Sequence, residues 1–228
     1  MSVEKKASGV WQIVPPRPGP RRRNAPRLPP DQRRAQLLDA ALRVLARDGL
    51  PRLTMQAVAK EAGVAKPVLY ALYPTAAELV AALLHREHTR GMHQVLATLP
   101  EDLSSSDPDE EYTRATLGFL AAVASDPLRW RLILMPSDGA PAEYRELLAT
   151  ARDGLVERCR DLLTAGIQLR GGPVDADVEL IASVMVGFTE VLGRLVLSDP
   201  ERYTPERLRP TVRSLLRTLP RGDNPSPG

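Results

Sequence analysis

Aromatic residues, cysteines and long apolar runs are all scarce in this chain. Aromatic residues make up 4% of the 228 residues, and Cys159 is the single cysteine. A lone cysteine excludes an internal disulfide and a cysteine metal tetrad, which is typical of a reducing compartment. No apolar run reaches the roughly 18 residues that a membrane-spanning helix needs, and no apolar signal segment opens the sequence. We therefore expect a cytoplasmic protein with no membrane partner.

Catalytic and cofactor-binding motifs are missing as well. The sequence contains no G-x-S-x-G, no P-loop and no G-x-G-x-x-G. The three histidines, His85, His88 and His93, lie within one short stretch. A metal held by His85 and His88 would lack a third well-placed ligand, which zinc titration tests. We expect no enzyme activity, no catalytic residues, no metal and no cofactor.

Helix-forming residues and an uneven charge distribution are what the sequence does contain. Ala, Leu and Arg dominate, and hydrophobic residues make up 43% of the chain, so the composition favours an all-α fold with a real core. Residues 1–30 carry a net charge of +6, residues 31–90 carry +3 and residues 91–228 carry −6. This asymmetry favours a protein that meets a polyanion at one end.

The composition divides the chain into four parts. Residues 1–30 hold seven prolines and an Arg21–Arg23 cluster, so we expect a disordered basic tail, either a DNA-seeking arm or a solvated segment. Residues 31–84 are predicted to form a helix-turn-helix domain. Residues 85–219 are predicted to form a helical ligand-binding and dimerisation domain, and residues 220–228 a disordered tail.

Local signals place the helices of the N-terminal domain. A first helix from Asp31 ends at Asp48-Gly49, where glycine gives a C-cap signal. Thr54 is the predicted N-cap of a second helix, and Gly63 supplies the tight turn to a third, because it tolerates positive φ. Thr75 and Glu78 form a capping box that begins a fourth helix, predicted to end near Leu96.

Helical periodicity continues after an acidic, serine-rich loop at residues 102–109. We expect helices over about 112–124, 128–134, 141–169 and 175–197. A last amphipathic segment runs from Leu208 to Leu219, and Pro210 either kinks its helix or makes it begin near Arg209.

The helix-turn-helix residues resemble the tetracycline-repressor (TetR) family of bacterial transcription regulators. The resemblance covers about residues 33–84, and its motifs are LLDAAL at 37–42, Asp48-Gly49, TMQAVA at 54–59, Ala62-Gly63-Val64, Leu69-Tyr70, Tyr73-Pro74 and Glu78-Leu79. It implies a ligand-responsive repressor that binds a palindromic operator in double-stranded DNA as a homodimer. It also implies a small-molecule site in the C-terminal domain.

Three positions depart from that family's pattern. Ala65 stands where Ser or Thr often caps the third helix, and Ala76 stands where Lys commonly contacts a phosphate. Pro67 replaces a common Gly, which a first helical turn tolerates. These changes weaken expected backbone contacts without damaging the fold.

The third helix would place its first side chains at base edges in the major groove. Lys66, Pro67 and Val68 are the predicted base-reading residues, since Lys donates to guanine and apolar groups contact the thymine methyl. The predicted phosphate contacts are Thr54, Tyr70, Arg33, Arg34 and Arg52, and the three arginines are equally compatible with ordinary exposed positions. A non-specific architectural DNA binder that uses the basic tail is the alternative function.

The C-terminal domain contributes the predicted effector site and subunit interface. Seven residues are expected to line a largely apolar pocket, although each could simply fill a core: Phe119, Trp130, Met135, Cys159, Leu163, Met185 and Phe188. Arg129 and Arg131 either bind an anionic group or are solvated. The predicted dimer interface consists of Leu180, Gly187, Val191, Leu195, Val212 and Leu216.

Overall fold

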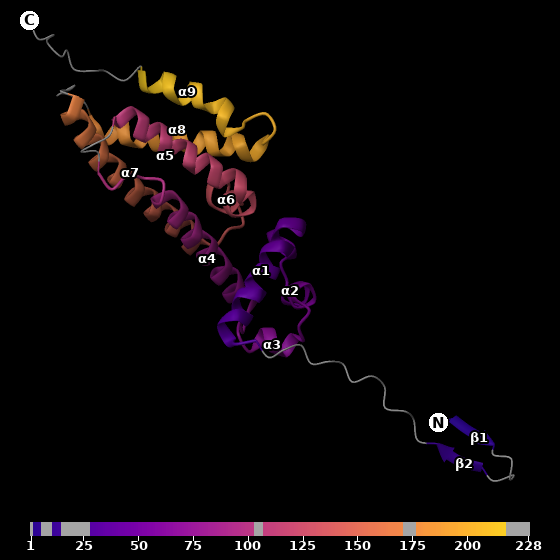
Figure 1. The fold of residues 1–228 in the computed structure, drawn as a ribbon. Helices are drawn as coiled ribbons and strands as arrows, with labels where there is room; N and C mark the ends of the chain where they lie inside the picture. Colours follow the sequence, from indigo (N-terminus) through magenta and orange to yellow (C-terminus); the bar gives the residue numbers. More distant parts are fainter. Residues whose placement is uncertain (1, 6–10, 15–27, 103–106, 171–176, 218–228) are drawn as a thin grey trace, which may run out of the picture. The chain divides into compact units, whose positions relative to one another are not determined.

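The computed structural model describes residues 2–5, 11–14, 28–102, 107–170 and 177–217 (Figure 1). Its elements are β1 (Ser2–Lys5), β2 (Trp11–Val14), α1 (Pro30–Asp48), the 3₁₀ helix η1 (Leu50–Arg52), α2 (Met55–Ala62), α3 (Lys66–Tyr70), α4 (Ala76–Leu96), α5 (Pro108–Ser125), α6 (Pro127–Leu134), α7 (Ala142–Arg170), α8 (Val178–Ser198) and α9 (Pro205–Arg217). The fold class predicted for residues 31–219 is confirmed, since every described element from α1 onward is helical.

The N-terminal segment departs from the expectation of a disordered tail. β1 pairs with β2 in an antiparallel arrangement in which Ser2 lies opposite Val14 and Lys5 opposite Trp11. The prediction is wrong for these two segments, because valine, tryptophan and isoleucine favour strands and outweigh the surrounding proline-rich composition. The remaining residues of that tail up to position 27, and the tail at 220–228, lie outside the described residues.

Helices α1, α2 and α3 enclose a first hydrophobic core together with the start of α4. Leu37 and Ala41 of α1, Val58 of α2 and Leu69 of α3 are all fully buried there. The i, i+3, i+4 spacing of the apolar residues brings these side chains onto one face of each helix. Figure 1 shows the three helices gathered at the N-terminal end of α4.

The predicted caps set the boundaries of these helices. The Thr54 hydroxyl accepts a hydrogen bond from the Ala57 N–H at 3.1 Å, and Thr75 accepts one from the Glu78 N–H at the same distance. Gly63 ends α2 in the left-handed conformation at φ 67° and ψ 29°, which costs glycine little because it has no Cβ. The turn between α2 and α3 is therefore encoded locally.

The later helices enclose a second core. Helix α8 packs against α5, α6 and α7, while α9 packs on α5. The rings of Phe119 and Trp130 meet edge to face with centroids 5.0 Å apart. Helix α9 begins at Pro205, earlier than Arg209, and contains Pro210 within its length.

Helix α8 corrects the expectation that no segment of the chain is long and apolar enough to span a membrane. It spans 21 residues with a mean hydropathy of 1.8, so by length and composition alone it could cross a membrane. Core helices of soluble proteins have the same properties, and α8 carries Glu190 and Arg194 among its apolar residues. Its packing against three other helices accounts for part of its apolar surface.

Helix α4 joins the two helical regions without a break. Leu79 and Leu83 belong to the first core, whereas Leu84 packs with Ala140 and Tyr144 beyond it. The domain boundary between residues 84 and 85 stays a prediction.

Candidate DNA-binding face and effector cavity

Helix α3 presents the predicted base-reading side chains to solvent. Lys66, Pro67 and Val68 are exposed, while Leu69 directly after them is fully buried. The Lys66 Nζ donates to the Gln56 Oε1 at 3.1 Å, so α2 orients the lysine. Gln56 was not among the predicted residues, although its exposed position in the first turn of α2 was a usable signal.

The predicted phosphate-binding residues occupy different settings. Tyr70 is 48% exposed at the end of α3, and Arg52 is exposed in η1. Thr54 is exposed too, and its hydroxyl hydrogen remains available because the oxygen acts as acceptor in the α2 cap. Arg34 is exposed and Arg33 is half-buried on α1. All five stay predictions as DNA contacts.

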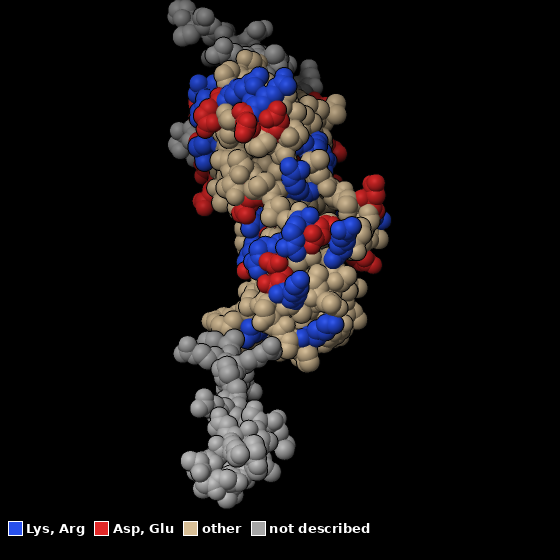
Figure 2. All heavy atoms as spheres, turned by 90° about the vertical axis from the view of Figure 1, so that its right-hand side faces the viewer, with Lys and Arg blue, Asp and Glu red and all other residues tan. Residues whose placement is uncertain are grey.

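Two arginines of α1 fix the position of α2. Arg43 Nε lies 2.9 Å from Glu61 Oε1, and Arg47 lies 3.1 Å from Glu61 Oε2. These hydrogen bonds hold the pKa of Glu61 below its ordinary value. On the face drawn in Figure 2, basic and acidic side chains are likewise interspersed.

Helices α4 to α8 enclose a cavity of about 360 Å³. Of the predicted pocket residues, Phe119, Trp130, Cys159, Leu163 and Met185 line it. Met135 is 47% exposed and Phe188 packs into the second core, so neither contributes to the described lining. Both predictions were wrong, because periodicity does not distinguish a side chain beside a void from one that packs into the core, as Phe188 does, or one that faces solvent, as Met135 does.

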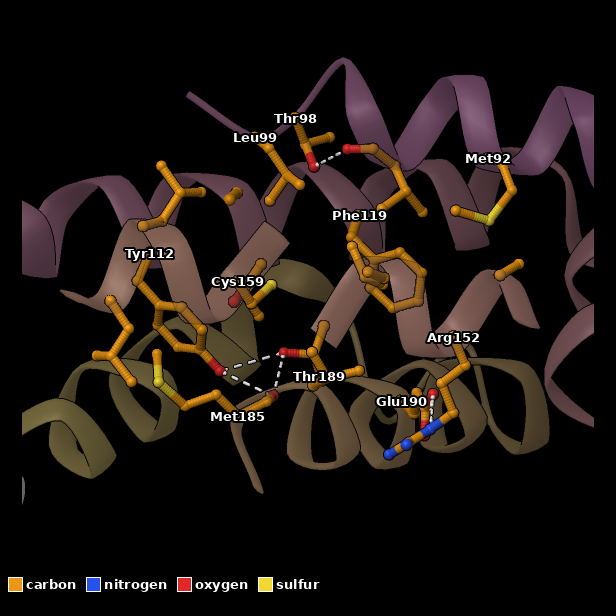
Figure 3. Close-up of a pocket in the computed structure, with 18 of the residues that line it drawn as sticks. Met92, Thr98, Leu99, Tyr112, Phe119, Arg152, Cys159, Met185, Thr189 and Glu190 are labelled. Carbon is orange, nitrogen blue, oxygen red and sulfur yellow. Dashed lines mark hydrogen bonds and ion pairs between the residues drawn. The ribbon is translucent and has the colours of Figure 1, made fainter. Parts of the chain in front are cut away.

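Sequence reasoning missed the polar groups of the cavity, which Figure 3 shows. The Tyr112 hydroxyl lies 3.2 Å from the Met185 carbonyl oxygen, to which it donates, and 3.1 Å from the Thr189 hydroxyl. Burial raises the pKa of Tyr112, so it remains a neutral phenol. Arg152 Nε pairs with Glu190 Oε1 at 3.0 Å. A tyrosine within an otherwise apolar helix face was the available signal.

Cys159 also lines this cavity, where burial raises the pKa of its thiol. The thiol is therefore less ionised than that of an exposed cysteine, which agrees with the interpretation of Cys159 as a small apolar group rather than a redox sensor.

A buried carboxylate connects α4 to α6 beside the cavity. Glu87 is 0% exposed, and Arg129 donates from Nε to its Oε2 at 3.0 Å. Arg86 bonds the other Glu87 oxygen at 2.7 Å and also bonds Asp39 of α1 at 2.7 Å. Ion pairs thus run from the helix-turn-helix region into the cavity wall.

The arrangement of these charges corrects one expectation. Arg129 is not solvated, because it is buried and Glu87 engages it in the interior. Arg131 is exposed, in agreement with the solvated alternative, and donates to the Leu197 carbonyl oxygen at 2.6 Å. The signal for Glu87 was its place among Leu83, Leu84 and Gly91, on the apolar face of α4.

An apolar stripe on α8 remains uncovered. Leu180, Val184 and Val191 are 60%, 58% and 46% exposed, and Gly187 lies between them on the same face. Two of the other predicted interface residues differ: Val212 is fully buried within the subunit and Leu195 is half-buried against the second core. Because Val212 is buried in the core of its own subunit, its prediction as a dimer-interface residue was wrong. The Leu216 side chain lies outside the described residues.

Comparison with known proteins gives consistent matches. Residues 37–83 match the model of bacterial regulatory proteins of the tetR family. A TetR-like transcriptional regulator from Rhodococcus sp. RHA1 is 28% identical, with a TM-score of 0.66, over 85% of this chain and 100% of that one. FadR from Bacillus subtilis, solved in complex with stearoyl-CoA, shares the fold at 19% identity and a TM-score of 0.64, over 81% of this chain and 97% of that one.

A curated relative covers less of the chain. The transcriptional activator FasR of Mycolicibacterium smegmatis is 35% identical over 120 residues, which are 51% of this chain and 52% of that protein. The match therefore spans about half the length of this relative.

Helices α2 and α3, joined at Gly63 and followed by a helical domain with an internal cavity, define a helix-turn-helix protein of the regulatory class. The matched residues and the similar structures then narrow its kind: residues 37–83 form a helix-turn-helix domain of the TetR family, and the chain shares its fold with a TetR-like regulator.

Proposed function

We propose that this protein is a cytoplasmic, non-catalytic regulator that binds a palindromic operator as a homodimer and releases it when an apolar effector enters the cavity. One observation carries the proposal: the chain combines a solvent-facing Lys66-Pro67-Val68 segment with an enclosed cavity in the adjoining domain. The two sites are joined through α4, and a ligand that favours one subunit arrangement changes DNA affinity by its difference in binding free energy.

The DNA-binding part predicts a specific contact pattern. Lys66 would donate to guanine, while Pro67 and Val68 contact a thymine methyl. Two copies would read successive major grooves with half-site centres roughly 34 Å apart or more. The test is a selection of bound duplexes from random DNA at fixed salt. It is carried out separately with the wild type, with Lys66→Ala and with Lys60→Ala.

The selection outcomes separate the possibilities. An inverted repeat that changes at one base position in Lys66→Ala, but not in Lys60→Ala, supports the proposal, because Lys60 is an equally exposed lysine of α2 outside the reading helix. Recovery of no inverted repeat refutes the operator and favours the architectural DNA binder. An identical motif for Lys66→Ala refutes the base-reading assignment alone.

The apolar stripe on α8 supports the homodimer. Its three large side chains are spaced at 180, 184 and 191, which places them on one face of the helix, and Gly187 allows close approach there. Sedimentation should therefore find that the wild type is a dimer and that the double variant Leu180→Glu/Val191→Glu is a monomer. Leu96→Glu, which alters a 52% exposed leucine away from α8, is the control. A dimeric double variant would contradict this interface.

The cavity lining supports an effector with a long apolar portion. Met92, Leu155, Leu163 and Ile167 face it from two helices. The similar fold of FadR holds stearoyl-CoA, so acyl compounds are the first effectors to test. Measuring operator affinity with and without them determines whether the ligand releases DNA, as proposed here, or tightens binding. A relative named as an activator makes that second outcome worth measuring.

A further inference from the structure

Two residues that line the cavity each hold a buried ring nitrogen with no hydrogen-bond partner in the described part of the chain. The two nitrogens are Nε2 of His88, on α4, and Nε1 of Trp130, on α6. His88 is 7% exposed and Trp130 is 2% exposed. Native proteins leave few buried polar atoms unpaired, and each such atom calls for an explanation. A ligand whose polar group shifts the surrounding side chains enough to reach the two nitrogens would satisfy both.

Packing places the two residues at the same part of the wall. A Cβ on Gly91 would lie 3.7 Å from the Trp130 Cη2, so the indole rests against α4 at Gly91. His88 lies three residues before Gly91, and residues at that spacing share a helix face. The edge-to-face contact with Phe119 holds the indole in place.

The charges around the cavity disfavour an anion. Asp109, Glu111 and Glu190 contribute carboxylates to the described lining, whereas Arg152 is its arginine and already bonds Glu190. Arg129, behind Trp130, is engaged by Glu87. An anionic ligand would therefore lose its hydration without gaining an uncommitted arginine in this lining.

We propose that the cavity recognises a neutral carbonyl group, a ketone, ester or thioester attached to an apolar body, whose oxygen accepts from the Trp130 indole N–H and from His88 in its neutral tautomer with the proton on Nε2. The indole nitrogen is a donor only, so it requires an acceptor on the ligand. A neutral carbonyl supplies that acceptor without the desolvation cost of a carboxylate. This inference rests on the proposed effector cavity and specifies the chemistry of its ligand.

Three ten-carbon probes with the same phenyl and four-carbon skeleton test the proposal: butylbenzene, butyrophenone and 4-phenylbutanoate. Isothermal titration calorimetry at pH 7.5 measures each with the wild type, Trp130→Phe, His88→Leu and Met92→Leu. We expect the ketone to bind at least tenfold more tightly than the carboxylate. Trp130→Phe should weaken ketone binding about fivefold to tenfold, the range of one hydrogen bond, and His88→Leu by several-fold.

The hydrocarbon and the Met92 variant provide matched controls. Butylbenzene affinity should change less than twofold in Trp130→Phe and His88→Leu, because it makes no hydrogen bond. Met92→Leu alters a lining residue without a polar hydrogen and should leave the ketone-to-hydrocarbon ratio unchanged. Circular dichroism of each variant checks its fold.

The outcomes distinguish this inference from the proposed function. If none of the three compounds binds, the effector cavity is refuted and the inference falls with it. If the compounds bind but the carboxylate equals the ketone, only the neutral-ligand inference is overturned. Equal losses of ketone and hydrocarbon affinity in Trp130→Phe overturn it as well, because the indole would then act through its shape.

Discussion

Replacing Glu87 with glutamine removes the central charge of the ion pairs between α4 and α6. The carboxylate is fully buried and meets Arg129 at 3.0 Å, with a second bond at 2.7 Å from Arg86. Glutamine retains the shape but leaves the guanidinium groups without their shared counter-charge. Since the Arg129 side chain is only 10% exposed, water cannot replace the lost partner.

The expected loss follows from the cost of an uncompensated buried charge. Removing one partner of a buried pair costs about 3–5 kcal/mol. Arg129 keeps bonds to Asp126 and Gln94, and Arg86 keeps Asp39, so we expect the lower end, about 3 kcal/mol. With a urea m-value of about 2 kcal/mol/M, the unfolding midpoint should fall by about 1.5 M.

Urea unfolding followed by circular dichroism and tryptophan fluorescence measures this change. Glu157→Gln is the matched control, because Glu157 and Arg160 form a pair at 3.3 Å with side chains 67% and 42% exposed. An exposed pair contributes less than about 1 kcal/mol. If the two variants lower the midpoint equally, the reasoning about the buried charge is refuted.

Three further results are expected. Gly193→Ala should destabilise the protein by about 1–3 kcal/mol, because its Cβ would lie 2.8 Å from Leu134 Cδ1 and 3.0 Å from Phe119 Cε1; Gly154→Ala, with open space around it, should be neutral or stabilising in the same melts. Burial lowers the pKa of His88, so folding favours its neutral form and this contribution to stability is present above about pH 6.5 and lost as pH falls. Urea midpoints at pH 7.5 and 5.0 should therefore differ less in His88→Leu than in the wild type, and an equal difference would contradict this. The raised thiol pKa of Cys159 should make its alkylation by iodoacetamide at pH 8 much slower in the native protein than in guanidinium chloride, as mass spectrometry can measure; equal rates would show that the thiol is accessible.

The helix-turn-helix was predictable because its signals are local. Thr54, Gly63 and Thr75 act within three residues of their own positions, so the sequence alone locates the ends of α2 and α4. Lys66 is exposed and Leu69 is fully buried, as their charged and apolar side chains predict.

The effector domain was less predictable because its features depend on distant partners. Leu163 borders the cavity while Phe188 fills the core, yet both lie on apolar helix faces. Val212 faces its own subunit only because α9 packs on α5. The burial of Glu87 is explained by its hydrogen bond from Arg129, which lies 42 residues away in the sequence.

The ion pairs that join α1, α4 and α6 also limit how this regulator can be recombined with others. A chimera joined after residue 84 would bring in a foreign α1 while keeping Arg86, whose 2.7 Å partner Asp39 belongs to the replaced part. A donor domain therefore needs an acidic residue at the position of Asp39. Moving the junction beyond Gln94 would instead separate Glu87 from Arg129, so hybrid sensors should be designed around these pairs rather than at the domain boundary.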